Sequence, residues 1–214
     1  MFEFKLNLKH YDYTVKCEDP YIIVIHNFMS DAEIRALLNA AGDKYIRSQV
    51  GIVGRVSDCR TSTSATLASK DTSVLAQPHI RVAKLTGVDK KHHEEFDIVK
   101  YEKGQHFEPH YDWYNDSDAD SAHEMKIGGQ RCITILVCLE EPKLGGATNF
   151  PYIPLAIQPV KGDAVLWINT NKEGKGEIMT LHEGQEVKEG TKIVMNSWIR
   201  TKEQFWPKSS LIFK

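Results

Sequence analysis

The sequence predicts an α+β, mainly β protein whose helices are confined to its first half. The chain has 214 residues, of which 41% are hydrophobic, and this suits one globular domain with a full core. Amphipathic patterns typical of helices occur before residue 95, and short β-type runs separated by Gly, Pro, Asn and Asp follow it. We therefore expect a strand and helix scaffold over 1–95, contiguous with a β core over 96–205, in a single domain.

The first half begins with a strand and continues with two helices. The β-branched run from Tyr21 to Ile25 predicts a buried strand. Ser30 to Glu33 reads as a capping box that opens an amphipathic helix, and Gly42 ends it. The segment 65–87 is expected to be helical in its second part, with Pro78 in the first turn.

The second half contains four short runs that predict β-strands. They are Phe96 to Tyr101, Arg131 to Leu139, Ala164 to Ile168 and Lys192 to Ile199. Their spacing suits an antiparallel sandwich or barrel, in particular a jelly roll with an open mouth and the helices packed on one sheet. The acidic segment Asn115 to Ser121 is expected to be a mobile surface loop, or alternatively a lid over a site.

Charge and composition exclude several classes of protein. The chain carries 27 basic and 29 acidic residues, which argues against a nucleic-acid binder. Its first residues never build the apolar run of a signal peptide or membrane span, so we expect a cytoplasmic protein without membrane association. The four cysteines lack a C-x-x-C spacing and are expected to be free thiols, with Cys132 and Cys138 on the same face of one strand.

A metal site is indicated by two residues in the second half. His110 and Asp112 are two positions apart, so an extended backbone points both side chains the same way. One distant histidine would complete a facial triad of two histidines and one carboxylate, which leaves positions open on Fe(II) for a 2-oxo acid and dioxygen. His182 is the candidate for that third ligand.

Lys192 follows His182 by ten positions in the last β-type run. A cation one strand away from the metal could pair with the far carboxylate of 2-oxoglutarate while its other end chelates iron. We therefore expect Lys192 to hold this cosubstrate.

Further motifs stand in order along the chain. They are Tyr101 followed by Gly104-x-x-x-x-Pro109-His110-x-Asp112, then Arg131-x-x-Thr134, Gly145-Gly146-x-Thr148-x-Phe150-Pro151 and Pro159-x-x-Gly162-x-Ala164. From about Tyr21 to Arg200 the chain resembles the prolyl 4-hydroxylase family of Fe(II)/2-oxoglutarate dioxygenases. The resemblance implies a double-stranded β-helix that hydroxylates peptidyl proline in a proline-containing peptide or protein, releases succinate and CO2, consumes O2 and uses ascorbate as a reductant.

The resemblance also implies roles for individual residues. Tyr101 and Thr134 would line the 2-oxoglutarate pocket beside Lys192, whereas Arg131, Trp198 and, more weakly, Arg60 would lie near the substrate. The aromatic side chains of Tyr111, Trp113 and Tyr114 could stack on a polyproline peptide or simply pack.

The chain departs from the family at two places. It lacks the Cys-Pro that follows the distal histidine of collagen-type relatives, and it carries Arg200 where some relatives have histidine. The alternatives left open are the same chemistry on a lysyl peptide, a free amino acid or an alkylated base, a Zn hydrolase using the same ligands, and a jelly-roll binding protein without turnover. The oligomeric state is not predicted.

Overall fold

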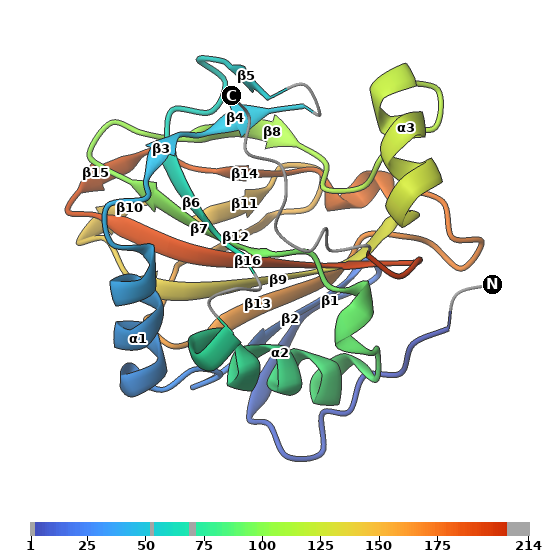
Figure 1. Ribbon diagram of the computed structural model, residues 1–214. Helices are drawn as coiled ribbons and strands as arrows, with labels where there is room; N and C mark the ends of the chain where they lie inside the picture. Colours follow the sequence, from blue (N-terminus) through green and yellow to red (C-terminus); the bar gives the residue numbers. More distant parts are fainter. Residues whose placement is uncertain (1–2, 52–53, 69–71, 205–214) are drawn as a thin grey trace, which may run out of the picture.

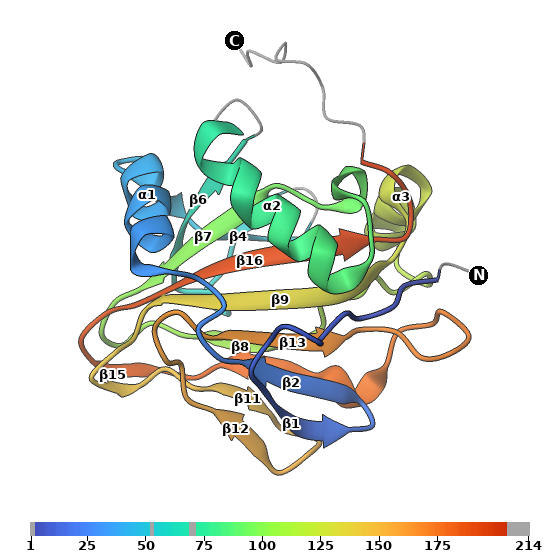
Figure 2. The same cartoon turned by 90° about the horizontal axis from the view of Figure 1, so that it is seen from below.

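Two facing β-sheets and a layer of helices make up the protein. The computed structural model describes residues 3–51, 54–68 and 72–204. Its helices α1 (Asp31–Ala41) and α2 (Thr72–Thr86) cover one face of an eight-stranded sheet, and a four-stranded sheet lies against the other face (Figures 1 and 2). Within the described ranges, no helix is long and apolar enough to span a membrane.

The large sheet joins strands from both halves of the chain. In order across the sheet they are β1 (Tyr13–Glu18), β2 (Tyr21–Ile25), β13 (Ala164–Ile168), β9 (Arg131–Glu140), β16 (Lys192–Arg200), β7 (Phe96–Tyr101), β6 (Thr63–Leu67) and β3 (Ile46–Arg47). All neighbours are antiparallel. The predicted strands are thus confirmed, and β2 pairs with β13 and β6 with β7 across the expected boundary at residue 95.

The small sheet is the second sheet of the jelly roll. Its order is β12 (Leu155–Ile157), β11 (Thr148–Phe150), β14 (His182–Gly184) and β8 (Phe107–His110). Two short ribbons complete the described strands, β10 (Leu144–Gly145) with β15 (Val187–Glu189) and β4 (Gln49–Val50) with β5 (Arg55–Val56).

The strands of the large sheet read as continuous apolar runs because both of their faces are buried. On β2, Ile23 and Ile25 join the core under the helices, whereas Ile22 and Val24 join a second core between the sheets. On β16 the same alternation sends Met195 toward the helices and Val194 toward the interior of the sandwich. The space between the sheets is therefore lined by every second residue of these strands.

All four cysteines are free, as predicted. However, Cys132 packs in the core under the helices, whereas Cys138 lines a cavity between the sheets. The expectation that both face the same side is wrong. The pairing of β9 with β16 shifts between Ile199 and Arg200, at Cys132, and an irregularity of this kind breaks the alternation of side chains.

The helices confirm one prediction and correct another. Ser30 and Glu33 form the predicted capping box of α1, and the N–H of Gly42 bonds to Leu38 O at 3.0 Å to end it. Pro78 lies inside α2 and not in its first turn. A proline removes only one backbone donor, so a helix can continue through it. The prediction was wrong because the apolar pattern near Pro78 did not reveal the helical turns before it.

A third helix occupies part of the segment expected to be a loop. Helix α3 (Ala119–Gly128) begins inside the acidic run, where the Asp118 carboxylate accepts the N–H of Ser121 at 2.9 Å. Its polar sequence lacks an apolar stripe, so periodicity could not reveal it. Short 3-10 helices, η2 (Lys90–His92) and η3 (Ile178–Thr180), complete the described helical segments.

A pair of histidines, the buried His93 and the half-buried His79, joins α2 to the large sheet. His79 stacks on Phe96 with a centroid distance of 4.0 Å, and its Nδ1 lies 3.2 Å from Nδ1 of His93. Burial lowers the pKa of His79 to about 4, with a smaller contribution from Lys90. Burial and then His79 lower the pKa of His93 to about 3.

Acid should destabilise the fold through this pair. Because the folded pKa values lie below the ordinary value of 6.5, the unfolded state binds more protons below that pH. The contribution of the two neutral histidines to the free energy of unfolding is therefore fully present above about pH 6.5. It is lost as the pH falls toward their folded pKa values. In urea unfolding between about pH 6.5 and pH 5, the wild type should lose about 1 kcal/mol per pH unit more than His93→Gln. Equal slopes would contradict the assignment.

Candidate active site

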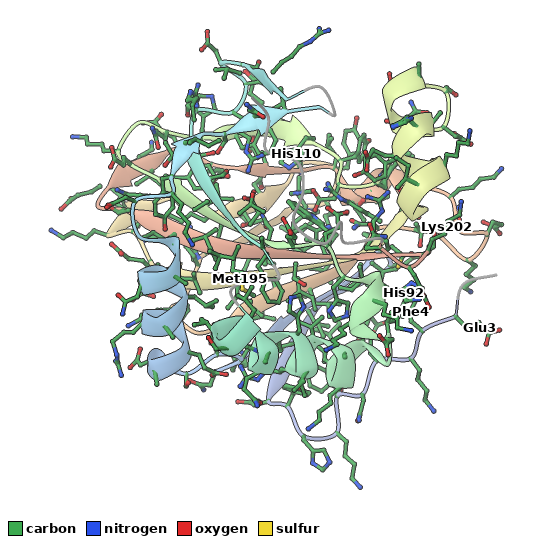
Figure 3. All side chains as sticks on the ribbon, viewed as in Figure 1. Glu3, Phe4, His92, His110, Met195 and Lys202 are labelled. Atoms are coloured by element: carbon green, nitrogen blue, oxygen red, sulfur yellow. The ribbon has the colours of Figure 1, made fainter. Side chains whose placement is uncertain are left out.

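Three potential metal ligands meet where β8 and β14 pair. His110 ends β8, His182 begins β14, and the two residues are directly opposite each other in the antiparallel pair. Asp112 follows two residues after His110 and brings its Oδ2 to 3.7 Å from Nε2 of His182. One ligand atom from each residue lies within 4.8 Å of the others. Figure 3 shows His110 in this region, on β8.

Backbone carbonyls orient both histidine rings. Nδ1 of His110 donates to Glu108 O at 2.8 Å, and Nδ1 of His182 donates to Thr180 O at 3.0 Å. Each bond fixes the proton on Nδ1, so Nε2 is left with its lone pair for a metal. The ring of Phe107 stacks on His110 with a centroid distance of 3.6 Å, and Trp167 packs against His182 at 4.8 Å.

The third ligand is held by a hydrogen-bonded chain that starts on β9. Thr134 Oγ1 donates to Asp112 Oδ2 at 2.7 Å and accepts from Asn169 Nδ2 at 2.8 Å. Burial alone would raise the pKa of Asp112, but the two imidazoles and this hydroxyl hold it below its usual range. Thr134 thus contacts a metal ligand in the structure, and its expected contact with a cosubstrate stays a prediction.

The donor set fits a divalent transition metal. Burial, together with His182, lowers the pKa of His110 to about 3, so this imidazole is neutral at physiological pH. Two histidine nitrogens and one carboxylate on one side of a site suit Fe(II) and leave coordination positions open. The same set can also hold catalytic zinc.

Lys192 lies at the other end of a narrow cavity that begins at these ligands. The cavity has a volume of about 50 Å³ and is lined by His110, Asp112, His182, Tyr101 and Lys192, among others. Lys192 pairs with Tyr101 across β16 and β7 and is only 3% exposed, with Nζ 5.5 Å from the centre of the tyrosine ring. Within the described ranges, no acidic side chain forms an ion pair with it.

The electrostatic state of Lys192 follows from this isolation. Burial lowers its pKa to about 8, against a smaller opposing contribution from Cys138. A buried cation without a partner is costly for a protein unless a ligand supplies the opposite charge. The cavity therefore has a metal-binding end and a carboxylate-binding end.

A wide cleft of about 1070 Å³ opens over the metal ligands, and Arg60, Arg131 and Trp198 line it. Their expected role near a substrate stays a prediction. Arg131 makes two bonds of 2.6 Å to the carboxylate of Glu94 and lies 4.0 Å from the centre of the Trp198 ring. Arg60 pairs with Asp97 at 3.4 Å. The side chains of Tyr111 and Trp113 also line the cleft.

Arg200, the residue that departs from the family pattern, also lines this cleft. It is 2% exposed and bonds to Glu94 at 3.0 Å, to Glu124 at 3.3 Å and to Gly129 O at 2.9 Å. Arg200 therefore ties α3 to the Glu94–Arg131 pair. Lys202 Nζ adds bonds to the carbonyls of Met125 and Lys126, at the foot of α3 (Figure 3).

Several residues of this arrangement escaped the sequence analysis, among them Glu94, Asp97 and Asn169. Asp97 could have been found, because it alternates with Val99 and Tyr101 along β7 and must share the face of Tyr101. Glu94 and Asn169 lie outside regular strands, so no periodic signal marked them.

Comparison with known proteins identifies the family. Residues 96–200 match the model of the 2OG-Fe(II) oxygenase superfamily, and these residues contain all three candidate metal ligands and Lys192. The chain belongs to the 2OG-Fe(II) oxygenase superfamily. The metal end of the cavity is thus the Fe(II) site of this oxygenase, and 2-oxoglutarate is its cosubstrate.

Curated relatives of this oxygenase include human prolyl 4-hydroxylase subunits. The chain is 32% identical to subunit alpha-1 over 191 residues, which is 87% of this chain and 36% of the relative. It is 34% identical to subunit alpha-3 over 186 residues, which is 85% of this chain and 34% of the relative. The oxygenase thus spans about a third of the length of these relatives.

Solved structures show the same fold. The 2OG complex of viral collagen prolyl hydroxylase vCPH from Paramecium Bursaria Chlorella virus-1 is 28% identical, with a TM-score of 0.68 over 86% of this chain and 98% of that chain. A Pseudomonas putida prolyl-4-hydroxylase, at 14% identity and a TM-score of 0.53, covers 90% of this chain and 94% of that chain, and it supports the fold alone.

The affinity for 2-oxoglutarate should fall at alkaline pH. Lys192 is charged below its pKa of about 8 and neutral above it, and only the charged form attracts a carboxylate. Above that pH we expect a loss of up to about tenfold per pH unit in wild-type binding under anaerobic conditions. In Lys192→Arg, which cannot lose its charge, any residual binding should be independent of pH. A flat wild-type profile would show that Lys192 is not the carboxylate partner.

Thr134→Val should weaken metal binding although the new side chain has nearly the same shape as threonine. The substitution removes the hydroxyl that bonds to Asp112, and loss of such a supporting bond typically costs about 10- to 100-fold in metal affinity. Competition between the protein and a chelator for Fe(II) measures the effect. Thr134→Ser keeps the hydroxyl and should bind iron like the wild type, whereas unchanged affinity in Thr134→Val would remove this bond from the account.

Proposed function

We propose that this oxygenase hydroxylates prolyl residues of peptides or proteins, using Fe(II), O2 and 2-oxoglutarate and releasing succinate and CO2. The observation that carries the proposal is the cavity with three metal ligands at one end and the buried, unpaired Lys192 at the other. A molecule that both chelates a metal and ends in a carboxylate matches these two ends.

His110, Asp112 and His182 would hold the iron, and Lys192 would hold the far carboxylate of the cosubstrate. When bound, Fe(II) supplies the oxygen chemistry that couples decarboxylation of a 2-oxo acid to hydroxylation of a C–H bond. The protein supplies binding and orientation. The Lys192 ammonium neutralises the distal carboxylate in a site from which most water is excluded, where such a charge pair is strong.

The ligand geometry is preorganised by the fold. The hydrogen bonds on both Nδ1 atoms and on the Asp112 carboxylate fix the directions of the ligand atoms before a metal binds. Tyr101 covers one side of the Lys192 stem and contributes a ring toward which the cation points. These contacts let the site bind its cosubstrate without a large rearrangement.

The cleft over the metal supports a peptide as the substrate. Its volume of about 1070 Å³ and its aromatic residues Tyr111, Trp113 and Trp198 suit an extended chain. Polyproline segments dock on aromatic surfaces at low entropic cost because they are already extended. Arg131 and Glu94 present charged groups beside Trp198. These groups would bond to the peptide backbone once their mutual pairing loosens.

The names of the similar proteins support the prolyl substrate. The curated relatives are prolyl 4-hydroxylase subunits, and the similar solved structure at 28% identity is a viral collagen prolyl hydroxylase. The identity of this chain's own peptide, ascorbate as reductant and a cytoplasmic location stay predictions of the sequence analysis.

The test is succinate release by protein reconstituted anaerobically with Fe(II) and then given 2-oxoglutarate and O2, with and without a proline-rich peptide. We expect the peptide to stimulate succinate release and to gain the mass of one oxygen atom on proline. Asp112→Ala should lose both signals by more than about 100-fold, because a metal ligand matters more than the bond that supports it.

Asp116→Ala is the matched control, since Asp116 is an exposed residue of the same segment. It should turn over like the wild type. Slow succinate release that no proline peptide stimulates would refute the prolyl substrate but keep the oxygenase. No succinate at all from iron-loaded protein would refute the oxygenase activity and favour a hydrolase with the same ligands.

A further inference from the structure

A second cavity begins at Lys192 and extends between the two sheets. We call it the rear cavity. Its volume is about 270 Å³, against about 50 Å³ for the cavity at the metal ligands. None of the three metal ligands lines the rear cavity, but Leu136, Thr148, Lys192 and Val194 line both cavities. Most of the open space around Lys192 therefore lies on the side away from the metal.

The walls of the rear cavity are mainly apolar. Leu136 and Val194 of the large sheet face Ile157 and Leu155 of β12, and Val165 of β13 closes one side. Such walls suit methylene groups, each of which gains free energy when it leaves water. They offer little to a ligand that is polar along its whole length.

The charged groups of the rear cavity favour an anion. Lys192 lies at its inner end, and Lys16 contributes a second cation at the exposed strand β1. The one carboxylate of the lining, Asp163, is already engaged, because its two oxygens lie 2.9 Å from His26 Nδ1 and from the backbone N of Asn27. A carboxylate that passes Lys192 would thus meet a further cation rather than a free negative charge.

The rear cavity reaches the surface beside β12. Ala156, Gln158 and Val160 line it and are exposed, whereas Ile157 and Val165 are buried. Its outer end is therefore not closed by packed side chains, and a ligand longer than the metal-side cavity has room to extend outward.

We propose that the rear cavity is the outer part of the cosubstrate site and binds the distal end of 2-oxo dicarboxylic acids longer than 2-oxoglutarate. Their 2-oxo end would take the metal side, and their additional methylenes would lie against Leu136, Val194 and Val165. Their far carboxylate would lie between Lys192 and Lys16. The proposal rests on the proposed function, because it extends the same 2-oxo acid site.

Competition binding tests the proposal without a peptide substrate. Fe(II)-loaded protein is held under anaerobic conditions with labelled 2-oxoglutarate, which is displaced by unlabelled 2-oxo dicarboxylic acids lengthened by one or two methylenes. In the wild type, the longer acids should bind within about tenfold of 2-oxoglutarate, because burial of the added methylenes offsets the displacement of the carboxylate.

Two variants that fill the rear cavity sharpen the test. Val165→Phe narrows its inner wall, and Val160→Phe narrows its exposed rim, where a larger side chain does not disturb the core. At least the rim variant should fold, and each folded variant should lose more than about tenfold in affinity for the longer acids while binding 2-oxoglutarate within about threefold of the wild type. Ala32→Phe, on the exposed face of α1, is the control for an added aromatic ring and should change neither affinity.

The outcomes separate this proposal from the proposed function. If labelled 2-oxoglutarate fails to bind to iron-loaded wild type, the cosubstrate site itself is refuted. If 2-oxoglutarate binds but one added methylene already costs the wild type more than about 100-fold, only the role of the rear cavity is refuted. The same conclusion follows if Val160→Phe and Val165→Phe, once folded, bind the longer acids as the wild type does.

Discussion

The antiparallel pairing of β8 with β14 is the interaction on which the site depends. It places His182 directly opposite His110 although 72 positions separate them in the chain, and the β-hydrogen bonds fix the distance between the two rings. Asp112 then needs only two more residues of backbone to reach the same point. A shift of one residue in this register would turn one histidine away from the other, because successive side chains of a strand point to opposite faces. The metal site is therefore a consequence of strand register in the small sheet.

The large sheet supplies the rest of the site through the same alternation of side chains. Lys192 and Trp198 are six positions apart on β16, so they share its inner face and serve the cosubstrate cavity and the substrate cleft respectively. Thr134 projects from the neighbouring strand opposite Trp198 and supports Asp112 from behind. The two histidine ligands come from the small sheet, whereas Thr134, Lys192 and Trp198 come from the large sheet. The core between the sheets thus sets the distance from the iron site to the lysine that would hold the cosubstrate.

The sequence could predict the parts of the site that follow from local spacing. His110 and Asp112 share a face in any extended segment, and Lys192 lies in a β-type run with a clear pattern, so both were found without a structure. The Arg200–Glu94–Arg131 network could not be found, because it joins residues from three separate segments through contacts that leave no periodic trace. Helix α3 was missed because its few apolar residues form no stripe, and the opposite orientation of Cys132 was missed because an irregular pairing has no signature in composition.

The central claim is that Lys192 recognises the far carboxylate of a molecule chelated by the metal. Calorimetric binding to Fe(II)-loaded protein under anaerobic conditions tests it most directly, by comparing 2-oxoglutarate with 2-oxobutyrate, which lacks the far carboxylate, in wild type and in Lys192→Met. If the claim is correct, the wild type should prefer 2-oxoglutarate by about 100-fold, and Lys192→Met should lose nearly all of this preference, since the two changes remove the same interaction. A preference of similar size in both proteins would contradict the claim, because some other group would then hold the carboxylate.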